Sequence, residues 1–70
     1  MINSDDLRFF QMIATHSSLA ATARALNVTP PTITQRLQAI EHKLKLKLVE
    51  RHARSITLTD EGELLVERAS

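Results

Sequence analysis

The sequence predicts a mostly α-helical fold of the winged helix-turn-helix class, with a three-helix core, a short two-stranded wing and the start of a further helix. Three observations support this prediction. Residues 19–44 have the pattern of two helices joined by a tight turn, residues 46–58 change to the shorter period of β-strands, and residues 59–70 return to a helical pattern. A chain of 70 residues allows one small domain. We therefore expect residues 1–58 to form the winged helix-turn-helix domain and residues 59–70 to begin another helix.

The first helix is predicted to end near Thr15-His16, and it has no feature of a chemical site. Ser4 can cap it, and Asp5 and Asp6 carry the charge that suits a helix N-terminus. Its apolar face is formed by Leu7, Phe10, Ile13 and Ala14. Phe9 is expected to be half buried beside this face. We expect this helix to be a scaffold against which the next two helices pack.

The second helix is predicted from about Leu19 to Leu26, with Ser17 or Ser18 as its N-cap. Asn27 follows, and asparagine tolerates the left-handed conformation in which many helices stop. Val28 is then expected to fill the corner between two helices. A small-residue helix, a tight corner and a following helix are typical of a helix-turn-helix, whose second helix enters the DNA major groove.

The third helix is predicted to start between Thr29 and Pro31 and to run to about Leu44. Thr29 is the candidate N-cap, and Pro30 and Pro31 lack amides where a first turn would leave them unpaired. The predicted buried stripe is Ile33, Leu37, Ile40 and Leu44, and the opposite polar face is Thr32, Thr34, Gln35 and Gln38. Glu41 and Lys45, four residues apart, are expected to pair. An ordinary helical hairpin with a hydrated polar face would show the same alternation, so this pattern alone leaves both interpretations open.

A two-stranded hairpin, the wing, is predicted after the third helix. The segment from Leu46 to Arg51 shifts to a shorter period, and the β-branched, alternating segment Ile56–Leu58 follows it. We expect Arg51 at the base of the wing and Arg54 near its tip.

The last helix is predicted to begin after its N-cap, Thr59, with acidic residues in its first turn. Gly62 lies inside the helical pattern, where glycine costs about 1 kcal/mol relative to alanine, so close packing against a neighbour is predicted. Leu64 and Leu65 could pair two subunits or pack within the domain, and both possibilities are open. The helical pattern still runs at Ser70, so we expect the chain to be a piece of a longer protein.

Charge is distributed unevenly along the chain. Residues 24–54 hold seven of the nine Lys and Arg residues but only two of the eight Asp and Glu residues, so both ends are acidic. A polyanionic partner bound by the middle of the chain would explain this distribution. The alternative is that Lys43, Lys45 and Lys47 only solvate an exposed face.

The composition argues against an enzyme. The chain has no cysteine and no Gly-rich phosphate loop. His16, His42 and His52 lack metal-ligand spacing, and each is expected to be a surface or helix-end histidine. No catalytic residue, cofactor or metal is therefore predicted. No apolar run approaches the roughly 20 residues of a membrane span, and no secretory signal is present, so a cytoplasmic location away from membranes is expected.

A set of residues in a fixed order spans nearly the whole chain: Leu7-Arg8-Phe9-Phe10, Ser18-Leu19, Ala23, Leu26, Val28, Pro31, Ile33, Leu37, Ile40-Glu41, Leu44, Leu48, Glu50-Arg51, Leu58-Thr59 and Gly62. This set resembles the N-terminal DNA-binding domain of LysR-type transcriptional regulators. The resemblance implies a winged helix-turn-helix followed by a linker helix, here beginning at residues 59–70, that pairs two subunits. It also implies a bacterial, nucleoid-associated regulator that binds a double-stranded DNA operator as a homodimer or tetramer, with a small-molecule effector bound by a domain absent from this chain.

Three positions depart from the family pattern. Pro30 stands where glutamine is usual and cannot make the contact expected of that side chain. Thr34-Gln35 replaces serine-arginine, and because an amide pairs with adenine whereas arginine prefers guanine, Gln35→Arg is expected to move the preferred base at one half-site position. Lys45 replaces a glycine, so a left-handed stop at this residue would carry roughly 1 kcal/mol of strain.

The predicted DNA interface combines the third helix, the start of the second helix and the wing. Its residues are Ser17, Ser18, Pro30, Pro31, Thr32, Thr34, Gln35, Arg36, Gln38, Arg51 and Arg54. The third helix would read base edges in the major groove, flanked by Arg36 and Lys43, with its leading end near thymine methyl groups.

The start of the second helix would hold a phosphate, and Arg54 would enter the minor groove. For Arg51, a phosphate contact and an ion pair with a nearby acid are both open. The alternative function is a winged-helix module for protein–protein contact, which a broad apolar patch in place of the basic charge would favour.

Overall fold

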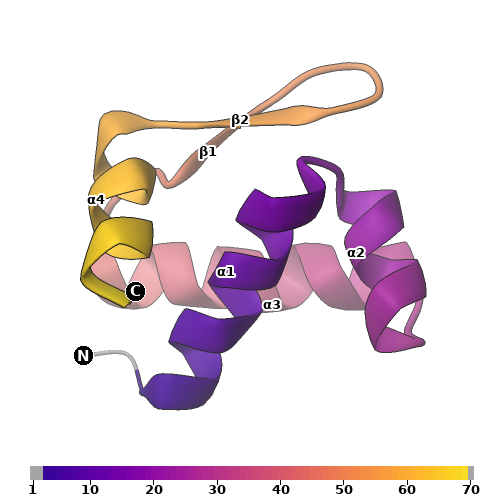
Figure 1. Ribbon diagram of the computed structural model, residues 1–70, viewed down its shortest axis with the longest axis horizontal. Coiled ribbons are helices and arrows are strands. Elements are labelled where there is room, and N and C mark those ends of the chain that lie inside the picture. Colours follow the sequence, from indigo (N-terminus) through magenta and orange to yellow (C-terminus); the bar gives the residue numbers. More distant parts are fainter. Residues whose placement is uncertain (1–2, 70) are drawn as a thin grey trace.

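The computed structural model describes residues 3–69, so the outer limits of the two predicted segments, residues 1, 2 and 70, lie outside the described residues. The elements follow in the order α1 (Ser4–His16), α2 (Leu19–Leu26), α3 (Pro30–Leu44), β1 (Val49–Arg51), β2 (Ile56–Leu58) and α4 (Asp60–Ala69). Helix α1 crosses α3, with α2 near one end of α3 and α4 near the other, and the hairpin covers one side of the helices (Figure 1). The predicted mostly helical, winged architecture is confirmed.

The N-cap of the first helix lies one residue earlier than predicted. Asn3, not Ser4, is the N-cap, because its side-chain oxygen accepts a hydrogen bond of 2.8 Å from the amide of Asp6, and Ser4 already belongs to the helix. Phe9 is also more buried than expected, with 4% of its surface exposed, because it packs in the core together with Phe10 and Ile13.

The second helix has the predicted bounds, and Ser18 is its cap. The Ser18 hydroxyl oxygen accepts from the amide of Ala21 at 3.2 Å, while Ser17 ends α1 in the left-handed conformation. Asn27 stops α2 with φ 59°, as predicted. The prediction for Val28 was wrong: this residue is 41% exposed, because its amide donates to the carbonyl of Ala23 at 2.9 Å and the backbone itself closes the corner.

The third helix starts at Pro30 and ends at the left-handed residue Lys45, with φ 56°. Thr29 occupies the N-cap position but makes no side-chain cap, and its hydroxyl instead contacts the hydroxyl of Thr32 at 3.0 Å. The expected pair of Glu41 and Lys45 does not form. Because Lys45 already leaves the helix, Glu41 turns to the following segment and its carboxylate accepts from the amide of Leu48 at 2.8 Å.

The wing is an antiparallel hairpin in which Val49 pairs with Leu58 and Arg51 pairs with Ile56. Arg51 therefore lies beside the loop and not at the base of the wing, where we expected it, because strand pairing begins only at Val49. The amide of His52 donates to the carbonyl of Ser55 at 2.9 Å and closes the loop. Arg54 lies in this loop, as predicted.

Helix α4 is anchored at its start by the Thr59 hydroxyl and by the close approach of Gly62 to the Leu48 carbonyl. The Thr59 hydroxyl oxygen accepts from the amide of Gly62 at 3.1 Å, which confirms the predicted cap, and it donates to the carbonyl of Lys47 at 2.6 Å. A Cβ on Gly62 would overlap the carbonyl oxygen of Leu48 and come within 3.3 Å of the Phe10 ring. The glycine is thus required by close packing, as the sequence predicted.

One aliphatic core joins all these elements. From α3 it contains Ile33, Leu37 and Ile40, while Leu44, the fourth residue of the predicted stripe, is half buried at its edge. The remaining buried apolar residues are Phe9, Phe10, Ile13, Ala23, Leu48, Val49 and Ile56. This core fixes α3 so that the side of the helix opposite Ile33 and Leu37 faces solvent.

Candidate nucleic-acid interface

Helix α3 presents a continuous exposed stripe opposite the core. Pro31, Gln35, Gln38 and His42 recur at steps of three and four residues, which place them along one face of the helix, and all are exposed. Thr32 is exposed at the edge of this stripe. Among the polar residues predicted for this face, Thr34 is different because it is half buried.

His42 was not among the predicted interface residues. The sequence indicated only a surface or helix-end histidine, yet the structure places it one helical turn beyond Gln38 on the exposed stripe. The signal that could have found it is its spacing, since it continues the series of Pro31, Gln35 and Gln38.

The wing lies beside this stripe. An open hollow of about 380 Å³ separates α3 from β1, and it is lined by Gln38 and Glu41 on the helix and by Arg51 on the strand, together with Lys47, Val49 and Glu50. Lys47 and Glu50 form an ion pair at 3.6 Å within this lining. Arg51 is in none of the ion pairs of residues 3–69, so the structure gives no support to the ion-pair alternative for it.

Arg51 also lines a second hollow, of about 180 Å³, between the start of α2 and the wing loop. The other lining residues come from both sides: Ser18, Leu19 and Ala20, and His52, Ala53, Arg54, Ser55 and Ile56. Because the first amides of a helix have no partner within it, the amides of Leu19 and Ala20 are suited to an anion at this place. The predicted phosphate contact at the start of α2 and the two arginines predicted on the wing thus lie beside the same hollow.

Ser17 holds these two parts in register. Its carbonyl accepts from the amide of Ile56 in the wing at 3.0 Å, and its hydroxyl donates to the carbonyl of Ala14 at 3.4 Å. Both groups of Ser17 are therefore engaged within the chain. Its predicted contact with DNA remains a prediction, whereas its position explains why the wing loop stays next to the start of α2.

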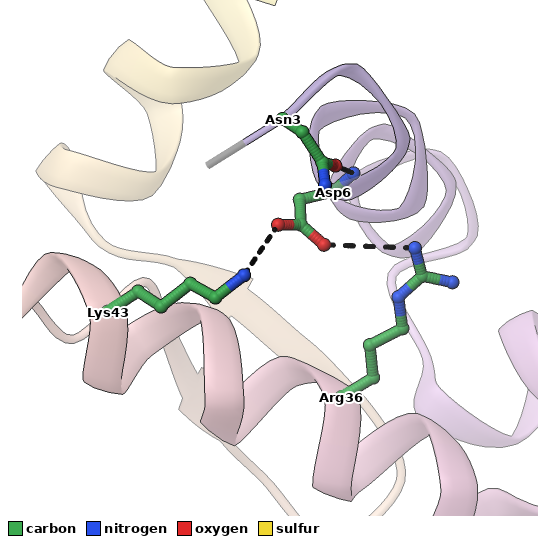
Figure 2. A network of polar contacts seen from close by, with 4 residues as sticks. All are labelled: Asn3, Asp6, Arg36 and Lys43. Atoms are coloured by element: carbon green, nitrogen blue, oxygen red, sulfur yellow. Dashed lines mark hydrogen bonds and ion pairs between the residues drawn. The ribbon is translucent and has the colours of Figure 1, made fainter. Parts of the chain in front are cut away.

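The two basic residues of α3 are turned toward α1. Arg36 Nη2 lies 3.8 Å from Asp6 Oδ1 and Lys43 Nζ lies 3.3 Å from Asp6 Oδ2, as Figure 2 shows. The Arg36 guanidinium also lies over the Phe9 ring, 4.6 Å from its centroid. Both side chains were expected to flank the exposed stripe of α3. To do so, each would have to leave its contact with Asp6.

Residues 3–69 contain no cluster of His, Cys, Asp or Glu that could hold a metal ion. Among these same residues, no helix is both long enough and apolar enough to cross a membrane.

Comparison with known proteins gives a consistent result. Residues 4–63 match the family model of bacterial regulatory helix-turn-helix proteins of the lysR family. The chain is 37% identical over 65 residues to the HTH-type transcriptional regulator DmlR of Escherichia coli K12, a match that covers 93% of this chain and 21% of DmlR. The chain thus spans about a fifth of the length of this curated relative.

Two solved structures have the same fold. The chain matches a crystal structure of a CbnR_DBD–DNA complex with a TM-score of 0.89 and 37% identity, over 97% of this chain and 78% of that one. It also matches the full-length structure of AphB, a virulence activator of Vibrio cholerae and a member of the LTTR family, with a TM-score of 0.87 and 38% identity. That match covers 94% of this chain and 23% of AphB.

Proposed function

The chain belongs to the lysR family of bacterial regulatory helix-turn-helix proteins, and on this premise we propose that it binds double-stranded DNA at an operator to regulate transcription. Its activity is binding and not catalysis. The relative CbnR, whose DNA-binding part has been crystallised with DNA, supports this proposal by its likeness to nearly the whole chain.

The observation that carries the proposal is the position of Arg51. It lines both the hollow beside Gln38 of α3 and the hollow beside Ser18 of α2. The exposed stripe of α3, the wing and the start of α2 therefore form one connected surface. A duplex bound to this surface would place its bases against the polar side chains of α3. Its phosphates would at the same time lie against the cations of the wing and the amides of α2.

In the proposed complex, α3 lies in the major groove. Gln35 and Gln38 offer amides that pair with the N6 and N7 groups of adenine, Thr32 offers a hydroxyl, and Pro31 offers apolar contact to thymine methyl groups. Thr34, being half buried, would reach the DNA only at the edge of the helix. Pro30, exposed at the first helical position, would contact the sugar–phosphate backbone by its ring alone.

The phosphates would be held at the second hollow. The amides at the start of α2, with Ser18, would bind one phosphate, and Arg51 would bind another. Arg54, exposed in the wing loop, would enter the adjacent minor groove, where narrow A·T tracts attract arginine.

We further propose that the whole protein is a dimer or tetramer that responds to a small-molecule effector bound by another domain, and that it acts in the cytoplasm at the nucleoid. Leu64 of α4 is 54% exposed and is suited to a partner subunit, whereas Leu65 packs against the core. The two leucines would thus have the two different roles that the sequence left open.

A module for protein–protein contact is the weaker candidate. The large apolar residues that are exposed lie outside the stripe of α3. Leu26 and Val28 flank the corner after α2, and Leu46 and Leu64 line one hollow between the end of α3 and α4. On the surface formed by α3 and the wing they do not make the broad apolar patch that such a partner would need.

Selection of bound duplexes from a random library, followed by affinity measurement at several salt concentrations, tests the proposal. With roughly 4–6 phosphate contacts per subunit, log K should fall against log salt with a slope near −4 to −5. A half-site with adenines opposite α3 is the expected product. Absence of binding at low salt, or an affinity that does not change with salt, would contradict the proposal.

A further inference from the structure

A nearly buried carboxylate lies between α1 and α3. The side chain of Asp6, on the first turns of α1, is 10% exposed, and its two oxygens face two different cations. Arg36 and Lys43 come from the same side of α3, two helical turns apart, and reach the carboxylate from either side (Figure 2). No other acidic residue of the described chain bridges two cations in this way.

The burial of Asp6 explains why both cations are held. A carboxylate removed from water is stabilised only when opposite charges and hydrogen bonds replace its hydration, so removal of either partner leaves a poorly compensated charge. Arg36 is held by a second feature of α1, since its guanidinium covers the ring of Phe9, one turn after Asp6. These contacts connect the start of α1 to the middle and the end of α3.

This arrangement changes the charge that α3 offers to DNA. Arg36 is the only charged residue between Pro30 and Ile40. When it faces Asp6, the part of α3 that would enter the major groove presents only uncharged side chains. The next cation, Lys43, faces the same carboxylate.

We propose that Asp6 keeps Arg36 and Lys43 out of the DNA interface, and that these two residues are positioning residues that fix the orientation of α3 on α1. The part of this inference that concerns DNA depends on the proposed function. The operator would then be read by amides, hydroxyls and proline rings, a set that suits adenine and thymine, while phosphates are neutralised elsewhere, at the start of α2 and on the wing.

The competing view is that Arg36 and Lys43 bind phosphates. Their side chains are 45% and 50% exposed, so either could turn toward a duplex if its contact with Asp6 were weak. The two views differ in a measurable quantity, because a mutation that removes one phosphate contact lowers the salt slope by about 0.9.

The first experiment needs no DNA. Thermal unfolding is measured for Asp6→Asn, Arg36→Met and the double variant, with Arg54→Met as a control that removes an arginine with no carboxylate partner. We expect each single change to lower Tm by about 5 °C and the double variant to lower it by little more than one of them. Strictly additive losses would overturn the role of Asp6 as the partner of Arg36.

The second experiment measures binding to the selected operator and to an unrelated duplex over a range of salt concentrations. For Arg36→Met and Lys43→Met we expect the salt slope of the wild type, and for Arg51→Met, which removes a proposed phosphate contact, a slope reduced by about 0.9. Arg36→Met should lower the preference for the operator over the unrelated duplex about 10-fold, because a tilted α3 makes fewer base contacts. Arg36→Lys, which keeps a charge for Asp6, should recover part of that preference.

The outcomes separate the two proposals. A wild-type chain that does not bind either duplex contradicts the proposed function, and the unfolding cycle then decides the role of Asp6 alone. A chain that binds, but whose Arg36→Met variant has a slope smaller by about 0.9, contradicts this inference and leaves the proposed function intact. If Arg36→Met is too unstable for binding measurements, Lys43→Met provides the same comparison at the other oxygen of Asp6.

Discussion

Two regions of the molecule use arginine in opposite ways. At the contact of α1 with α3, Arg36 is held by Asp6 and by the ring of Phe9. On the wing, Arg51 and Arg54 take part in no ion pair of the described residues and line a hollow beside α2. All three arginines carry the same charge, and all three are exposed. Their surroundings differ because one region contains a buried carboxylate and the other does not.

The difference follows from what holds each region in place. Helix α3 is fixed on α1 by the apolar core, and at the edge of this contact the charges of Arg36 and Lys43 both face Asp6. The wing is fixed by the buried side chains of Val49 and Ile56 and by backbone hydrogen bonds. The amide of Ile56 donates to the carbonyl of Ser17, and the amide of Thr59 donates to the carbonyl of Leu48, each at 3.0 Å. Because the wing is held without its exposed arginines, these side chains stay available for a ligand.

The largest effect is expected from a mutation at the close contact between Gly62 of α4 and the Leu48 carbonyl, just before the wing. Gly62→Val should lower the free energy of unfolding by more than about 3 kcal/mol, because the new side chain meets the Leu48 carbonyl and the Phe10 ring, neither of which can move easily. In a domain of marginal stability this change leaves most molecules unfolded. Urea denaturation measures it, with Glu67→Ala, an exposed change on the same helix, as a control expected to stay within about 0.5 kcal/mol.

The second prediction concerns an arginine introduced on α3 at a position that does not face Asp6. Gln35→Arg adds a cation on the exposed stripe, away from Asp6, and should move the preferred base at one half-site position from adenine to guanine by about 1–3 kcal/mol. Selection from a random library measures the preference, and Gln35→Met, which removes the amide without adding charge, is the matched control. An unchanged preference in Gln35→Arg would show that this residue does not read a base.

The third effect tests the contribution of the Thr59 hydroxyl to the anchoring of α4. Thr59→Ala removes both the cap of Gly62 and the bond to the Lys47 carbonyl, and should cost about 1–2 kcal/mol of stability. Thr59→Ser keeps the hydroxyl and should cost clearly less in the same denaturation experiment. Equal losses for the two variants would assign the effect to the methyl group instead.

The smallest effect is a gain. Lys45 ends α3 with φ 56°, a conformation that costs a residue with a side chain roughly 1 kcal/mol, so Lys45→Gly should raise the free energy of unfolding by about 0.5–1 kcal/mol. Lys45→Ala keeps the strained conformation and separates this gain from the removal of the lysine side chain. A glycine variant no more stable than the alanine variant would contradict the argument.

Much of the fold could be predicted from the sequence because its signals are local. Asn27, Thr59 and the two prolines at 30 and 31 mark helix ends within one turn of themselves, and these predictions were confirmed. Gly62 was correctly assigned to close packing, because a glycine inside a helical pattern costs stability unless a neighbour occupies the place of its side chain. The stripe of Ile33, Leu37 and Ile40 was found by its period alone.

The errors concern residues whose surroundings come from distant parts of the chain. Val28 was expected to be inside because it is apolar, but a backbone bond had already closed the corner. Arg51 was wrongly placed at the base of the wing. The residue at which strand pairing begins depends on the partner strand, and the local pattern does not show it. The DNA contact of Arg36 stays a prediction, but its neighbours show the same limit, because periodicity could not reveal that Asp6 and Phe9 lie beside it.

The sequence by itself therefore determined the class of fold, the bounds of the three core helices to within a residue or so, and the family to which the chain belongs. Only the tertiary structure decided which cations lie next to a carboxylate, since Lys43 and its partner Asp6 are 37 residues apart. The physical reason is that capping and amphipathic periodicity act within a few residues, whereas burial and charge pairing depend on which surfaces meet after the chain has folded.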